Sequence, residues 1–292
     1  NNRRNGRRRL CHGDVESEGG NVITAGVDVG TRFIKVCVTD GEHLRGSACA
    51  EIGPRFDALI RSLLKEARVQ ARAGRWEIKK IVATGFGGHL VKKAAFTLGE
   101  AACAARSAFF FDRDIRTVID LGGLFITVST IDKNGFLETT HVNERCAAGS
   151  GKFLEMVAEA AEVPFTEISS CAAASRQPYS SSSSCAVFAE SEIISQVNTG
   201  MKPSDILAGV IRAIASKTAS LIDGAGAKDK IVLIGGLSKV SAVRDMLTGL
   251  TGRSMTTLPI DSQLVAAFGA ALIAQGKIIR KRQGLSVTGE AA

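Results

Sequence analysis

The clearest regularity in the chain is a pattern of hydrophobic and polar positions that occurs twice. An apolar run at 23–31 contains Asp-Val-Gly-Thr at its end, and residues 33–40 then alternate between apolar and polar, as a half-buried strand does. The pattern returns 92 residues later, where Asp120 takes the place of Asp28 and residues 125–132 form the second run. We therefore predict two strand-turn-strand units, each with an aspartate at the end of its first strand.

Further elements follow each unit in a similar order, which predicts two related α/β domains with a cleft between them. We place the first domain at residues 21–115 and the second at 116–276, so that both aspartates face the cleft. In the first domain we expect a third strand at 43–52, a helix at 56–72, a strand at 80–85 and helical stretches at 88–108. In the second we expect a strand near 136–142, two helices that begin at cysteines, and then a helix at 204–223, a strand at 231–236, a helix at 238–250, a strand at 255–259 and a helix at 262–275.

Two terminal segments lie outside these domains. Five arginines within the first nine residues account for much of the net charge of +8, and a Gly- and acid-rich stretch follows them. We expect residues 1–20 to be a disordered basic tail and residues 277–292 to be a C-terminal tail. Nucleic-acid binding is not expected, because aromatic residues are only 5% of the chain and do not alternate with basic ones.

Composition excludes several other classes of protein. No apolar run approaches the roughly 18 to 20 residues of a membrane span, and no secretory signal is recognisable. Seven cysteines without a CxxC pair argue against a zinc ribbon and against a regular disulfide scaffold. An odd cysteine count without a signal indicates a reducing cytosol, so we expect a cytoplasmic protein with no membrane contact.

The turns after the first strands have the composition of a phosphate site. Glycines at 30, 122 and 123 let backbone N–H groups approach phosphate oxygens without obstruction. Asp28 and Asp120 can hold Mg²⁺ through water and orient an attacking water, while Thr31 and Lys35 supply a hydroxyl and a cation. One such turn after a strand is usually only a turn. Two in register indicate an ATP–Mg²⁺ site in which Asp28, Asp120 and Lys35 carry the chemistry.

Two more glycine turns follow later strands in the predicted domains. Gly85 and Gly87 lie in Thr-Gly-Phe-Gly-Gly at 84–88, and Gly235 and Gly236 lie in Ile-Gly-Gly-Leu-Ser at 234–238. We expect all four to line the nucleotide site, with the later pair packing on the nucleoside.

Two cysteines stand at the starts of amphipathic segments. Cys146 precedes Gly149 and Gly151 in Cys-Ala-Ala-Gly-Ser-Gly, and Cys185 begins Cys-Ala-Val-Phe-Ala-Glu-Ser-Glu. A helix N-terminus lowers the pKa of a thiol and suits the thiolate to bind metal. Two cysteines supply only half of the ligands of a cubane cluster, but two related chains that meet at an axis could complete the set.

The duplicated turns resemble the nucleotide-binding core of the acetate kinase, sugar kinase, heat-shock ATPase and actin superfamily, which implies two ribonuclease H-like α/β domains around a nucleotide cleft. The segments at 146–155 and 185–196 are similar to the signature of the BadF/BadG/BcrA/BcrD ATPases, and the resemblance runs from about 23 to 274. That family comprises activators of 2-hydroxyacyl-CoA dehydratases and ATPase subunits of benzoyl-CoA reductases. The resemblance implies that Gly149 and Gly151 belong to the cofactor-binding segment.

The family resemblance also implies a cofactor and partners. Two such chains share one [4Fe–4S] cluster, each giving two cysteines, and Cys146 and Cys185 match those positions. The partners implied are a homologous ATPase subunit across the cluster, two substrate-binding reductase subunits, and ferredoxin as electron donor.

One departure from the family pattern affects the choice of function. The activators carry Gly-Gly-Gln-Asp where this chain has Gly-Gly-Leu-Phe at 122–125. The loss of the polar pair favours a heterodimer, and hence an ATP-dependent benzoyl-CoA reductase subunit of the BcrD- or BzdQ-like kind, an oxidoreductase acting on CH–CH bonds. The alternatives are a homodimeric activator of a 2-hydroxyacyl-CoA dehydratase and, in a different class, a sugar or N-acetylglucosamine kinase.

Overall fold

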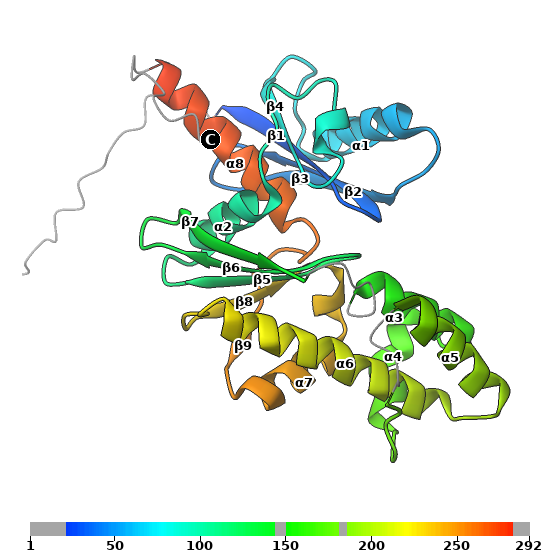
Figure 1. Cartoon of the computed structure of the whole chain (residues 1–292). Coiled ribbons are helices and arrows are strands. Elements are labelled where there is room, and N and C mark those ends of the chain that lie inside the picture. Colours follow the sequence, from blue (N-terminus) through cyan, green and yellow to red (C-terminus); the bar gives the residue numbers. More distant parts are fainter. Residues whose placement is uncertain (1–21, 144–149, 181–185, 283–292) are drawn as a thin grey trace, which may run out of the picture.

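The chain folds into two α/β lobes, each built on one sheet (Figure 1). This computed structural model describes residues 22–143, 150–180 and 186–282. The first half contains β1 (Ile23–Val29), β2 (Phe33–Thr39), β3 (Leu44–Glu51), α1 (Phe56–Gln70), β4 (Ile78–Thr84), the 3-10 turn η1 (Gly88–Leu90) and α2 (Glu100–Phe111). The second half contains β5 (Thr117–Leu121), β6 (Ile126–Ile131), β7 (Leu137–Val142), α3 (Gly151–Ala160), η3 (Phe165–Glu167), α4 (Ile168–Ala173), α5 (Ala186–Asn198), α6 (Pro203–Gly224), β8 (Ile231–Ile234), η4 (Gly236–Lys239), α7 (Ser241–Thr251), β9 (Met255–Thr256) and α8 (Val265–Arg282).

The two sheets share one topology. Their strand orders are β3-β2-β1-β4 and β7-β6-β5-β8-β9. In each, the first strand pairs antiparallel with the strand after it and parallel with a strand that returns through helices. Asp28 stands opposite Lys35 in the first sheet, and Asp120 stands opposite Thr127 in the second. The predicted duplication is therefore confirmed strand by strand.

Local sequence explains several helix boundaries in the second lobe. Ser150 precedes α3, and its hydroxyl accepts a hydrogen bond from the backbone N–H of Phe153 at 3.4 Å, which caps the helix. Helix α6 begins with Pro203, whose missing N–H costs nothing at a helix start. Helix α7 ends where Gly252 adopts φ +64°, the left-handed conformation that glycine takes most easily.

Three predicted elements differ from the structure. The helical stretch expected at 88–108 is interrupted, because the segment before α2 pairs with β4: Ala83 N–H donates to Phe96 O at 3.1 Å and Leu98 N–H donates to Ala83 O at 2.9 Å. The strand expected at 255–259 is only β9. Helix α8 runs to Arg282, so the first six residues of the tail expected at 277–292 are helical.

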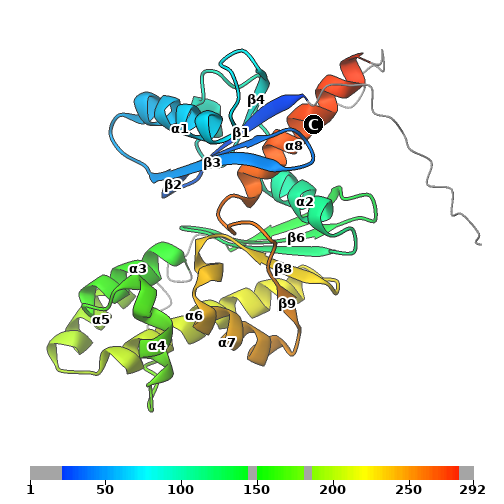
Figure 2. The same ribbon diagram turned by 180° about the vertical axis from the view of Figure 1, so that it is seen from behind.

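Each sheet is covered in part by a helix from the other half of the chain. Helix α1 packs on one face of the first sheet, while α8, the last helix, packs on the other (Figures 1 and 2). Helix α2 buries its alanines against β5, β6 and β8 of the second sheet. A division of the chain at residue 116 therefore does not separate the two cores.

The crossing of α8 with β1 and α2 is close. A Cβ at Gly26 would clash with the carbonyl oxygen of Ala267, and a Cβ at Gly269 would clash with that of Cys103. Thr24 Oγ1 donates to Ala271 O at 2.8 Å across the first of these contacts. The two lobes therefore meet through backbone-to-backbone packing. Within the described ranges, no helix is both long and apolar enough to cross a membrane.

Candidate functional site

Two equivalent hairpins face each other between the lobes. After β1, Gly30 N–H donates to Phe33 O at 3.1 Å, and after β5, Gly122 N–H donates to Phe125 O at 2.9 Å. Each hairpin follows a strand whose penultimate residue is the aspartate, Asp28 in β1 and Asp120 in β5. The two turns therefore repeat in space as they do in the sequence.

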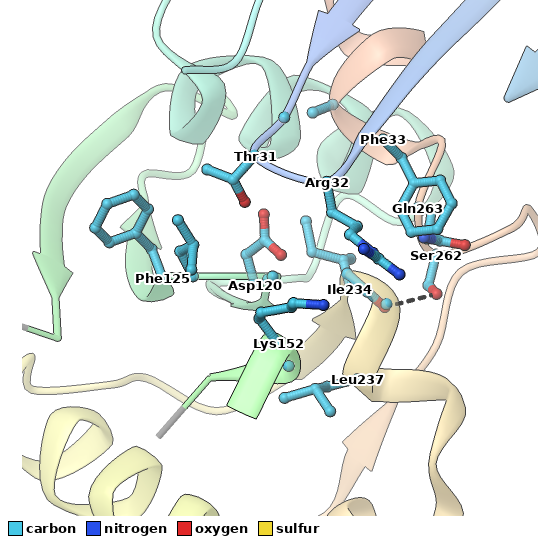
Figure 3. A pocket seen from close by; sticks show the side chains of 18 of the residues that line it. Thr31, Arg32, Phe33, Asp120, Phe125, Lys152, Ile234, Leu237, Ser262 and Gln263 are labelled. Carbon is cyan, nitrogen blue, oxygen red and sulfur yellow. Dashed lines mark hydrogen bonds between the residues drawn. The ribbon is translucent and has the colours of Figure 1, made fainter. Parts of the chain in front are cut away.

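A cavity of about 350 Å³ lies between these hairpins. Figure 3 shows Thr31 and Arg32 from the first lobe facing Asp120 and Lys152 from the second. Most of the residues predicted for the site line this cavity: Asp28, Gly30, Thr31, Lys35, Asp120, Gly122, Gly123, Gly151, Gly235 and Gly236.

Gly85 and Gly87, two further predicted site residues, are not among the residues that line this cavity. Gly85 adopts φ +83° and leaves no room for a Cβ beside Asp28 Oδ1, while a Cβ at Gly87 would come within 2.6 Å of the Val29 side chain. Gly235, at φ +85°, stands against Asp120 Oδ1 in the same way. Gly85 thus supports Asp28 and is the counterpart of Gly235. The assignment of Gly85 and Gly87 to the nucleotide site stays a prediction.

Asp28 and Lys35 form a buried ion pair at the base of the cavity. Lys35 Nζ lies 2.7 Å from Asp28 Oδ2, and the aspartate side chain is only 1% exposed. Asp28 Oδ1 is buried without a hydrogen-bond partner. Burial acts to lower the pKa of Lys35, but the nearby carboxylates, Asp28 first, outweigh it and the pKa is raised. Lysine therefore stays charged.

Asp120 sits in the same electrostatic environment. Burial raises the pKa of its carboxyl to about 6, with Lys35 opposing this shift and the negative charge of Asp28 adding to it. An added cation would relieve the repulsion between the two aspartates. The pair is therefore suited to a hydrated divalent cation. Among the described residues, no three His, Cys, Asp or Glu side chains come close enough together to hold a metal ion directly.

Glu100 is a third acid in the cavity that sequence reasoning missed. It is the first residue of α2 and lines the cavity with Asp28 and Asp120. Burial, followed by the charges of Asp28 and Asp120, raises the pKa of its carboxyl to about 8, against the opposing effect of Lys35. The sequence carried no signal for it, because an acid in the first turn of a helix is ordinary.

Arg32 connects the first hairpin to the second lobe. Its guanidinium lies 2.8 Å from Glu51 Oε1 and 2.5 Å from Glu155 Oε1 on α3. The N-terminus of α3 is also attached to the second hairpin, since Gly151 N–H donates to Gly122 O at 3.1 Å and Lys152 N–H donates to Gly123 O at 2.8 Å. Helix α3 therefore contacts both hairpins.

Apolar side chains occupy the mouth of the cavity. Leu124 and Phe125, which stand in place of the expected polar pair, line it and are 39% and 42% exposed. The Phe125 ring lies 6.3 Å, centroid to centroid, from the ring of Phe86 in the first lobe. The departure at 124–125 therefore creates an aromatic contact between the lobes.

The predicted cluster ligands Cys146 and Cys185 lie outside the described residues, as does Gly149. The helices that follow them in the chain, α3 and α5, pack against each other within one hydrophobic cluster, which includes Leu154 and Ile193. The other cysteines of the described part, at 37, 49, 103 and 171, are free thiols. The assignment of the cluster ligands stays a prediction.

Comparison with known proteins agrees with this arrangement. The sequence profile of the BadF/BadG/BcrA/BcrD ATPase family matches residues 25–274. The chain is 35% identical over 255 residues to the 2-hydroxyisocaproyl-CoA dehydratase activator of Clostridioides difficile, covering 87% of this chain and 95% of that one. It is 30% identical over 267 residues to one subunit of the benzoyl-CoA reductase of Thauera aromatica, covering 86% and 92%.

Solved structures show the same fold. The activator of the 2-hydroxyisocaproyl-CoA dehydratase from Clostridium difficile, with bound ADPNP, superposes with a TM-score of 0.82 at 32% identity, covering 92% of this chain and all of that one. A glucokinase of the ROK family from Streptomyces griseus gives a TM-score of 0.53 at 14% identity, covering 87% and 99%. The second likeness is one of fold alone. The predicted duplicated ribonuclease H-like architecture is confirmed.

Proposed function

The chain belongs to the BadF/BadG/BcrA/BcrD ATPase family, and from this premise we propose that it is an ATP-hydrolysing electron-transfer activator of an enzyme that acts on acyl-CoA. The observation that carries the proposal is the cavity in which Asp28, Asp120 and Lys35 meet from both lobes. Glycine-lined hairpins can bind the phosphates of ATP, and the two aspartates can hold hydrated Mg²⁺.

A shared [4Fe–4S] cluster, with Cys146 and Cys185 as two of its four ligands, would supply the low-potential electron. In support, α3 begins at Gly151, soon after Cys146 in the chain, and is bonded to the hairpins at Gly122 and Arg32. A change in the cleft on hydrolysis would therefore move the segment that carries Cys146. This chain would act as a gate that couples ATP to electron transfer.

Two acyl-CoA reactions are candidates for the partner. The apolar pair at 124–125 supports a benzoyl-CoA reductase, in which a companion ATPase would carry the polar pair. The likeness to a 2-hydroxyisocaproyl-CoA dehydratase activator, at 35% identity against 30% for the reductase chain, supports the alternative of a homodimeric dehydratase activator. Anaerobic purification distinguishes them: a second ATPase chain with two reductase subunits indicates the reductase, and a homodimer indicates the activator.

The nucleotide site is tested by equilibrium binding of Mg²⁺–ATP and by turnover. We expect Asp28→Asn and Asp120→Asn each to lower the Mg²⁺-dependent affinity by more than about tenfold, because each removes a carboxylate next to the cation. Asp57→Asn is the matched control, since Asp57 pairs with Lys92 on the surface. Unchanged affinity and turnover in both site variants would mean that the hairpins are only structural.

The cluster is tested separately by assays of iron and sulfide in anaerobically purified protein. Cys146→Ser and Cys185→Ser should each lose iron, whereas Cys171→Ser, which changes a free thiol on α4, should retain it. Full iron content in the Cys146→Ser protein would overturn the ligand assignment. Iron and sulfide in the parent would also exclude a sugar kinase.

A further inference from the structure

We propose that Glu100 is the catalytic base of ATP hydrolysis in this chain, taking the proton of the water that attacks the γ-phosphorus. The inference rests on the proposed function, because it requires ATP in the cavity between the lobes. It assigns a role to an acid that lies at the start of a helix, away from the two phosphate hairpins.

The backbone that leads to Glu100 is attached to the strand beside Asp28. Leu98 N–H donates to Ala83 O at 2.9 Å, and Thr84 Oγ1 donates to Leu98 O at 2.9 Å. Thr84 stands directly opposite Asp28 in the parallel pair of β1 and β4. Glu100, two residues after Leu98, is therefore held at the same end of the sheet as Asp28.

Helix α2 is also fixed from its other side. Ser107 Oγ donates to Val265 O at 2.6 Å, and the carbonyl of Cys103 packs against Gly269 of α8 with no space for a Cβ between them. The helix can neither slide nor tilt without breaking these contacts. A carboxylate on such an element has the fixed position that a catalytic group needs.

The Glu100 carboxylate has no hydrogen-bond or ion-pair partner in the described part of the chain. By contrast, Asp28 binds Lys35 and Glu155 binds Arg32. An independent observation also points to a ligand here: Asp28 Oδ1 is buried in this cavity and lacks a partner. A hydrated cation would fill that position. If Asp28 and Asp120 hold that cation, as the proposed function requires, Glu100 is the carboxylate left to accept a proton.

Neither the fold nor the two hairpins require an acidic residue at position 100. In the second lobe, the helix at the corresponding end of the sheet, α8, begins with the apolar Val265. The duplicated architecture therefore does not require a charge at a helix start. Leu124 and Phe125 carry no side-chain group that could orient water, whereas the Glu100 carboxylate lines the same cavity.

The proposed step is balanced without a further reactant. The water oxygen forms a bond to the γ-phosphorus while the bond from that phosphorus to the bridging oxygen of ADP breaks. ADP keeps that electron pair, and the water proton moves to the Glu100 carboxylate. Glu100 releases the proton to solvent when phosphate leaves. No electron is transferred in this step.

The test uses the full chain with Mg²⁺–ATP and measures equilibrium affinity and single-turnover hydrolysis. Glu100→Gln should change affinity by less than about threefold and slow hydrolysis by about 10² or more, as loss of a general base does. Glu100→Asp keeps the charge at the helix start but shortens its reach, so we expect an intermediate rate. The control is Glu66→Gln, which changes an exposed glutamate on α1. This variant should hydrolyse ATP at the rate of the parent.

The outcomes separate the two proposals. Hydrolysis by Glu100→Gln within about threefold of the parent overturns the base assignment and leaves the ATP site intact. Loss of affinity together with hydrolysis makes Glu100 a binding residue, which also overturns it, as does a parent that binds ATP without hydrolysing it. A parent that does not bind Mg²⁺–ATP overturns the proposed function itself.

Discussion

At the scale of single residues, the cavity concentrates acids around one buried lysine. Lys35 pairs with Asp28, and the carboxyls of Asp120 and Glu100 lie within electrostatic range of both. Because burial and mutual repulsion disfavour their charged forms, the pKa of Asp120 rises to about 6 and that of Glu100 to about 8. The metal-free protein therefore holds protons where the proposed complex would hold a cation.

These raised pKa values predict how stability depends on pH in the absence of metal. The folded-state pKa of Glu100, about 8, lies above the ordinary value of 4.5, so the folded protein binds more protons than the unfolded chain between these values. Stability contributed by the neutral carboxyl should therefore fall as pH rises from about 4.5 to 8. In EDTA, Glu100→Gln should melt roughly 2 to 6 °C above the parent at pH 8, and the gap should shrink toward pH 5.

The control for this prediction is Glu66→Gln, which changes an exposed glutamate on α1. Its melting temperature should stay close to that of the parent at every pH. A constant gap for Glu100→Gln between pH 5 and 8 would show that the Glu100 carboxyl titrates in its ordinary range.

At the scale of secondary structure, the close crossing of α8 with β1 and α2 holds the lobes together. Gly269→Ala should destabilise the protein by about 3 kcal/mol or more, because its Cβ would overlap the Cys103 carbonyl in a crossing of two backbones. Chemical denaturation of the purified variant measures the loss.

Gly249→Ala is the matched control. Gly249 lies in α7 and has open space where a Cβ would be. Alanine there should stabilise the protein by about 0.5 to 1 kcal/mol, since glycine is a poor helix former. Equal effects of the two substitutions would contradict the packing argument.

Helix α3 is the element that connects the hairpins to the segment containing Cys146. Arg32 and Glu155 are each 31% exposed, so solvent screens their ion pair only in part. A double-mutant cycle with Arg32→Gln and Glu155→Gln should give an interaction energy of about 1 kcal/mol that decreases with added salt. Additive single effects would mean that the pair does not join the lobes.

At the scale of the whole molecule, the benzoyl-CoA reductase candidate requires two ATPase chains that differ in one hairpin. In this chain Leu124 and Phe125 stand at the cavity mouth, where Phe125 contacts Phe86 of the other lobe. They cannot orient water or bond to hydrated Mg²⁺. If the partner is a reductase with a companion ATPase, Asp120→Asn should lower ATP turnover of the complex less than the matching change in the companion.

That comparison needs both complexes purified anaerobically and assayed at saturating ATP. Equal losses would show that both sites hydrolyse ATP, with Glu100 compensating here for the missing polar pair. Abolished turnover with Asp120→Asn alone would reverse the assignment of roles.

The sequence by itself determined the duplicated fold and most of the candidate site. Asp28 and Asp120 were found because alternation of polarity along a strand and glycines after it are local patterns, and a local pattern that repeats in register identifies equivalent positions. The sequence also predicted Lys35 as a cation near the phosphates, while its place opposite Asp28 comes from the strand register. The ligand role of Cys146 and Cys185, which the family resemblance implies, lies outside the described residues and remains a prediction.

Only the tertiary structure decided what depends on contacts between distant segments. The sequence predicted a turn at Gly85, but only packing shows that it stands against Asp28 with no room for a Cβ. Glu100 follows an ordinary helix start, and nothing within its own segment shows that β4 and α8 hold it beside two aspartates. The local sequence also does not show that α2 packs on the second sheet and α8 on the first. A helix needs the same apolar face to pack on either sheet. These features depend on how the surfaces and charges of distant segments fit together, and a local sequence pattern contains no information about that fit.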